Sequence, residues 1–90
     1  MKKEIKLENL RQAIGELYNF ELKDIISQMS DQELMDSPFE HFGLDSLDVM
    51  DLMTTIEQKN DISIHADAIE TVMQKNTIRA LLEVCNEEQW

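Results

Sequence analysis

The chain has 90 residues, of which 42% are hydrophobic, so we expect a single small domain over residues 1–90 with a compact core. Nineteen acidic and eight basic side chains give a net charge of −11, which disfavours binding to nucleic acid and to anionic membranes. Two glycines and one proline are too few turn residues for an all-β fold, so the composition indicates an all-α protein. Neither a membrane span nor a signal-peptide core is visible, and we expect a cytoplasmic protein.

Apolar residues at three- and four-residue steps predict a long first helix over residues 6–28. The apolar stripe of this segment comprises Leu7, Leu10, Ile14, Leu17, Tyr18, Leu22, Ile25, Ile26 and Met29. Gly15 and Asn19 are weaker helix formers within this segment. The sequence is therefore compatible with one kinked helix or with two helices.

A long loop is expected over residues 30–43, because Ser37-Pro38 disfavours helix in its middle. A short helical turn at residues 31–35 is compatible with this reading. Phe39 and Phe42 are the large apolar residues near the end of the segment. We expect them to hold the loop against the core.

A second helix is predicted to begin at Ser46 and to end near Asn60. Its buried stripe, at positions i, i+3, i+4 and i+7, comprises Val49, Leu52, Met53 and Ile56. The acidic residues on or near its other face are Asp45, Asp48 and Asp51. The Ser46 hydroxyl is a candidate cap that accepts a backbone N–H of this helix. Val49 three residues later, in place of Glu or Gln, predicts that no capping box is present.

Two further helices complete an all-α, four-helix bundle whose third helix is short. The third is expected over residues 67–73 with Asp67 as its cap, and the last begins after Asn76 or Thr77. The last helix carries an apolar stripe that includes Cys85, the only cysteine of the chain. We expect a buried thiol there, because a reactive one needs partial exposure and a positive neighbour.

Ser46 lacks the neighbours of a catalytic nucleophile, which needs a base within hydrogen-bond reach. His41 and His65 are the only histidines, and no Gly-x-Ser-x-Gly turn surrounds the serine. A calcium loop that begins at Asp45 would need glycine at its sixth position, where Met50 stands. The residues therefore predict neither an enzyme nor a metal site.

The segment Phe42-Gly43-Leu44-Asp45-Ser46-Leu47 resembles the phosphopantetheine attachment motif of acyl carrier proteins. The similarity extends over residues 37–64 and more loosely over the other predicted helices. It implies a bundle of acyl carrier protein type with a long loop between the first two helices. It also implies that Ser46, flanked by Asp45 and Leu47, receives 4′-phosphopantetheine from coenzyme A through a phosphopantetheinyl transferase. The thiol of that arm then holds an acyl group as a thioester.

The same resemblance implies a surface that binds partner enzymes and an interior that shelters the acyl chain. Acyl-loading and acyl-processing enzymes with basic docking patches would contact Asp45, Leu47, Asp48, Met50, Asp51 and Glu57. An interior that shelters the acyl chain would be lined by Val49, Leu52, Met53, Ile56, Ile69 and Val72.

Three functions stay open on these grounds. The first is a free-standing, monomeric acyl carrier for fatty-acid, polyketide or related synthesis, and departures from the family pattern at Thr54, Gln58 and His65 favour a specialised pathway. The second is a carrier for an amino acid or another acid that an adenylating enzyme loads. The third is a helical interaction module in which Ser46 is only a helix cap.

Overall fold

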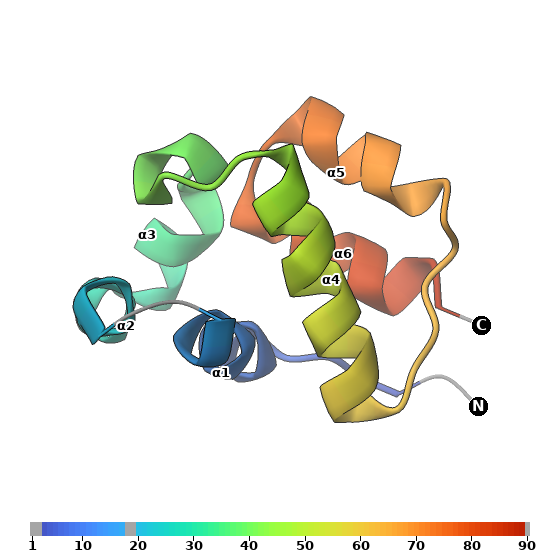
Figure 1. The fold of residues 1–90 in the computed structure, drawn as a ribbon, viewed down its shortest axis with the longest axis horizontal. Coiled ribbons are helices and arrows are strands. Elements are labelled where there is room, and N and C mark those ends of the chain that lie inside the picture. The colour runs from blue at the N-terminus through green and yellow to red at the C-terminus, as the bar shows by residue number, and fades with distance from the viewer. Residues whose placement is uncertain (1–2, 18–19, 90) are drawn as a thin grey trace.

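A computed structural model of the chain describes residues 3–17 and 20–89, and the regular elements in these ranges are helices (Figure 1). They are α1 (Leu7–Leu17), α2 (Phe20–Gln28), α3 (Asp31–Asp36), the 3₁₀ helix η1 (Phe39–Phe42), α4 (Ser46–Asn60), α5 (Ala68–Lys75) and α6 (Ile78–Glu87). Within the described ranges, β pairing is limited to one isolated bridge between Ile64 and Gln89. The prediction of an all-α protein is confirmed.

The longer helices α1, α4 and α6 form the bundle together with the short α5. Helix α4 packs on α1, and α6 packs on both α5 and α3. Figure 1 shows α4 in front, with α5 on one side, α1 on the other and α6 passing behind. This arrangement confirms the predicted bundle, including its short third helix, which has eight residues in α5.

The segment predicted as one long helix, or two, contains two helices. Helix α1 ends at Leu17 and α2 begins at Phe20. Gly15 lies within α1 and does not end it, whereas Tyr18 and Asn19 lie outside the described residues. The predicted apolar stripe is only partly buried: Ile26 is 3% exposed, whereas Leu17 is 38% and Ile25 is 52% exposed.

Arg11 fastens the end of α2 to α1. Its guanidinium donates to the backbone carbonyl oxygens of Ile26 and of Met29, the second at 2.9 Å, and to the Asp31 carboxylate at 2.9 Å. The last carbonyls of a helix lack partners within the helix itself. Arg11 supplies these partners and so docks α2 beside the start of α3.

The predicted loop over residues 30–43 contains two helical segments, α3 and η1. Ser30 caps α3, since its hydroxyl accepts the Glu33 N–H at 3.2 Å. Phe39 is 1% exposed and belongs to the core, and Phe42 packs against the core from its edge. The prediction that these two rings hold the segment to the bundle is confirmed.

Two amide side chains at the end of α6 hold the N-terminal segment. Asn86 accepts the Ile5 N–H at 2.8 Å and donates to the Ile5 carbonyl at 2.9 Å. Gln89 does the same for Lys3, at 2.8 and 2.7 Å, and is 3% exposed. These side chains satisfy an extended backbone that has no neighbouring strand. They bring the two ends of the described chain together, as Figure 1 shows.

Candidate functional site

The backbone turns sharply just before α4, at Gly43. This residue closes η1 in the left-handed conformation, with φ of 75°, and its N–H donates to the Glu40 carbonyl at 3.0 Å. A Cβ atom placed on Gly43 would have no neighbour within 4 Å. Glycine is therefore favoured here by its backbone freedom and not by lack of space. Leu44 follows, 7% exposed, and anchors the turn in the core.

Two aspartates cap α4. Asp45 is the N-cap, and its Oδ1 accepts the Asp48 N–H at 3.0 Å. Asp48 Oδ2 in turn accepts the Asp45 N–H at 3.1 Å, which completes a capping box. The predictions that Ser46 caps this helix and that no capping box is present are both wrong. The cap lies one residue earlier than expected, and an aspartate fills the position where Glu or Gln is usual.

Ser46 is the first residue of α4 and is exposed. Its hydroxyl has no hydrogen-bond partner among the described residues, and neither do the backbone amides of Ser46 and Leu47. Free amides at the positive end of a helix dipole are suited to a phosphate group. The residues at this position therefore fit a phosphate ester on the serine.

Within the described residues, no base is positioned to activate Ser46. His41 lies in η1, exposed, with its ring edge-on to Phe42 at a centroid distance of 5.3 Å. His65 lies in the connection after α4, where its backbone N–H donates to the Glu88 carbonyl. Any chemistry at the hydroxyl therefore needs a base from another protein.

The outward side of α4 combines apolar and acidic side chains. Leu47 is 68% exposed and Met50 is 48% exposed, and Asp51 is also exposed. Asp48 is half-buried because it takes part in the capping box. The structure thus brings together most of the residues that the sequence assigns to a partner surface.

Glu57, the remaining residue of that predicted surface, is less exposed than Leu47, Met50 and Asp51. It is half-buried, and its Oε2 accepts the Ile64 N–H at 3.2 Å. This bond ties the connection after α4 back to the last turn of the helix. Its proposed contact with a basic partner stays a prediction.

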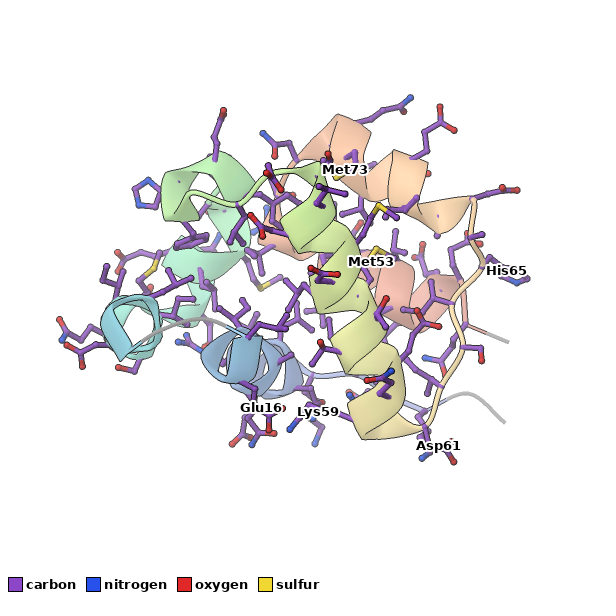
Figure 2. The ribbon with its side chains drawn as sticks, in the orientation of Figure 1. Glu16, Met53, Lys59, Asp61, His65 and Met73 are labelled. Carbon is purple, nitrogen blue, oxygen red and sulfur yellow. The ribbon has the colours of Figure 1, made fainter. Side chains whose placement is uncertain are left out.

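The residues predicted to shelter an acyl chain fall into two groups. Val49, Leu52, Ile56 and Val72 are 0% exposed and belong to the packed core. Met53 and Ile69 line a cavity of about 160 Å³ between α4 and residues 64–69. Figure 2 shows Met53 on α4 and His65 on the connection that leads to α5. Met50 and Glu57, which were predicted for the partner surface, also line the cavity, and sequence reasoning missed its other lining residues, Thr54, Ile64, His65 and Ala66. Thr54 could have been predicted, because it follows Met50 by four residues and so lies on the same side of the helix.

Cys85 is fully buried in α6, as predicted. Burial raises the pKa of its thiol to about 12, and the negative charge of Glu57 adds to the effect. The thiol therefore stays protonated at neutral pH and is a poor nucleophile.

Two further observations describe the same residue ranges, 3–17 and 20–89. They contain no group of three or more His, Cys, Asp or Glu side chains that could hold a metal ion. None of their helices is both long enough and apolar enough to cross a membrane.

Comparison with known proteins identifies the family of this chain. The model of a family described as the phosphopantetheine attachment site matches residues 9–85. No curated protein and no solved structure matches the chain. Members of that family hold a covalent 4′-phosphopantetheine, have no catalytic activity of their own, and work with a phosphopantetheinyl transferase and synthase enzymes. With a match over most of its length, the chain belongs to the phosphopantetheine attachment site family and is a carrier protein of the acyl carrier protein type.

Proposed function

We propose that Ser46 holds the 4′-phosphopantetheine arm and that the chain, as one carrier domain, delivers acyl thioesters to partner enzymes. The observation that supports this proposal is that the Ser46 hydroxyl is exposed at the start of α4 and has no hydrogen-bond partner among the described residues. In the loading reaction this oxygen bonds to phosphorus as the pyrophosphate bond of coenzyme A breaks, and adenosine 3′,5′-bisphosphate leaves. The transferase supplies the base that takes the serine proton, because the described residues place no histidine beside the serine.

The capping box supports this assignment. Because Asp45 and Asp48 satisfy the amides of each other, the start of α4 is fixed without help from Ser46. Modification of the serine therefore breaks no hydrogen bond of the fold. The two free amides at residues 46 and 47 remain available to a phosphate oxygen.

Partner enzymes would dock on the outward side of α4. Leu47 and Met50 offer an exposed apolar contact, and Asp51 offers a negative charge beside it. The net charge of −11 would attract basic patches on acyl-loading and acyl-processing enzymes to the chain, and the exposed carboxylate of Asp51 would favour this side. The pathway that fits is fatty-acid, polyketide or related specialised synthesis.

The alternative of an interaction module with Ser46 as helix cap has lost its premise, because Asp45 is the cap. The alternative of a carrier loaded by an adenylating enzyme shares the arm and the fold. The two carrier functions differ only in the cargo.

The test is the intact mass of the purified chain after incubation with coenzyme A and a broad-specificity phosphopantetheinyl transferase. We expect the wild type to gain one phosphopantetheinyl group and Ser46→Ala to gain none. Ser63→Ala, a change of another exposed serine, is the matched control and should gain one group. No gain in folded wild-type protein, or a gain in Ser46→Ala, would overturn the proposal.

A further inference from the structure

The extended segment over residues 3–5 lies against the ends of two helices that are distant in the sequence. The Lys3 ammonium donates to the carbonyl of Asn60, the last residue of α4, at 2.8 Å. The backbone N–H and carbonyl of Lys3 pair with the side-chain amide of Gln89, at 2.8 and 2.7 Å. Gln89 lies just beyond α6 and is 3% exposed. The N-terminal segment thus bridges the end of α4 and the end of α6.

The connection after α4, over residues 61–67, rests on the same end of the chain. The His65 N–H donates to the Glu88 carbonyl at 2.9 Å, and Ile64 forms an isolated β bridge with Gln89. Figure 2 shows His65 on this connection, at the edge of the molecule. Gln89 therefore contacts the connection through its backbone and the N-terminal segment through its side chain. Movement of Gln89 would release both segments.

Few apolar side chains hold these two segments to the core. Ile5 and Ile64 are buried, at 2% and 8% exposed, and Ile62 is half-buried. The exposed residues of the two segments are Lys3, Glu4, Asp61, Ser63, Ala66 and Asp67. Helix α4, in contrast, buries four apolar side chains along one stripe. Because local opening of the two segments exposes little apolar surface, it costs less free energy than unfolding of the helices.

The connection begins at a hinge. Asp61 lies directly beyond the last residue of α4 and has a left-handed backbone conformation, with φ of 53°. A Cβ atom makes this conformation unfavourable, although aspartate tolerates it better than most residues do. Opening of the connection relieves this cost. It leaves the body of α4 in place, because Asp61 lies outside the helix.

From these observations we propose that residues 3–5 form a latch on the connection over residues 61–67. The two segments open together through Gln89, as one cooperative unit, while the helices stay folded. Opening also frees the Glu57 carboxylate from the Ile64 N–H, so the latch links the chain ends to the last turn of α4. A protein that binds the released N-terminal segment would hold the connection open by mass action. The latch does not depend on an arm at Ser46.

The test is amide hydrogen exchange of the whole chain, followed residue by residue by NMR at low urea concentrations. The amides of Ile5, Ile64 and His65 should share one opening free energy and one dependence on urea, because a single event exposes all three. The amides of Leu52 and Ile56, in α4, should exchange only through global unfolding. Three unrelated urea dependences, or exchange of all five amides only through global unfolding, would overturn the latch.

The variant Asn86→Ala tests the coupling. The Asn86 side chain accepts the Ile5 N–H at 2.8 Å and donates to the Ile5 carbonyl at 2.9 Å. It makes no hydrogen bond to residues 61–67. In Asn86→Ala the amides of Ile64 and His65 should nevertheless open about tenfold more often, the factor for loss of a part-buried hydrogen bond. A folded variant in which exchange quickens at Ile5 alone would show that the two segments open independently, and would overturn the latch.

Two milder variants complete the design. Lys3→Met removes the bond to the Asn60 carbonyl from an exposed side chain and should keep the fold. It should raise the opening of Ile64 and His65 about threefold, and an unchanged opening would count against the latch. Asn9→Ala is the matched control, because Asn9 accepts the N–H of the residue just after the latch, at 2.8 Å. Opening of the connection should stay at the wild-type value in this control, and an increase equal to that in Asn86→Ala would overturn the specific role of residues 3–5.

Discussion

Asp45 and Asp48 each bind the backbone N–H of the other, at 3.0 and 3.1 Å, around the residue that we propose as the attachment point. Both carboxylates lie at the positive end of α4, where negative charge is stabilised. The pair fixes the direction in which the helix leaves the turn at Gly43. Ser46 is thereby presented on a rigid first turn without contributing to it.

Asp45→Ala and Ser46→Ala should therefore differ in stability. Asp45→Ala removes the cap and should lower the free energy of unfolding by about 1 kcal/mol. Ser46→Ala removes no hydrogen bond of the described residues and should change it by less than about 0.5 kcal/mol. Urea unfolding of both variants and of the wild type checks this. A loss in Ser46→Ala as large as that in Asp45→Ala would contradict the observed cap.

Substitutions at Gly43 should report on backbone conformation alone. An added side chain meets nothing within 4 Å, but φ is 75°. Gly43→Ala should lower the free energy of unfolding by about 1 kcal/mol, the strain of a left-handed residue with a Cβ atom. Gly43→Asn should lose less, since Asn adopts this conformation more readily. The urea midpoints of the two variants are the measurement, and equal losses would point to a steric cause.

The bounds of α4 were predictable because its buried apolar residues, Val49 to Ile56, repeat over about two turns and both neighbouring segments break the pattern. Its cap was not. In Asp45-Ser46-Leu47-Asp48 two adjacent residues are good caps, and the periodicity of the apolar stripe does not distinguish them. The decisive feature is the backward reach of the Asp48 carboxylate, which is a property of the folded turn.

Asn86→Asp should destabilise the fold strongly. The amide of Asn86 donates to the carbonyls of Ile5 and Leu82, at 2.9 and 3.1 Å, and a carboxylate cannot donate. We expect a loss of about 2 kcal/mol, since two part-buried carbonyl oxygens lose a donor and face a negative charge. Gln74→Glu, an exposed change that adds the same charge, is the control and should stay within about 0.5 kcal/mol of wild type. Thermal or urea unfolding distinguishes them, and equal stability would contradict the role of Asn86.

The stability of the chain should fall at high pH because of Cys85. Its thiol has a pKa of about 12 in the folded state, against 9.0 without the protein environment. The unfolded chain therefore loses this proton first, so the contribution is complete below pH 9 and is lost as the pH rises toward 12. The shift corresponds to about 4 kcal/mol over three pH units. Unfolding free energies at pH 8 and pH 11 should fall more steeply in the wild type than in Cys85→Ala, and parallel curves would contradict the shift.

The contacts of Asn86 and Gln89 mark the limit of prediction from this sequence. They join residues that lie 81 and 86 positions apart. Periodicity places residues on the faces of one helix but does not say which distant segment an amide will reach. The cavity beside α4 was partly predictable for the same reason: Met53 follows from the helix, whereas Ile64 depends on how the connection after α4 folds back onto Glu57.

The two hydrogen bonds between Lys3 and Gln89 hold the first and last described residues of the chain next to each other. Figure 1 shows both ends emerging side by side, away from the first turn of α4. A purification tag or a fused domain at either end would therefore project from the same point and leave the Ser46 side uncovered. A circularly permuted chain, with its old ends joined by a short linker, should also be able to keep this helix arrangement, because close termini tolerate such rearrangement. Immobilisation through either end would hold the protein on a solid support with its proposed loading serine facing the solvent.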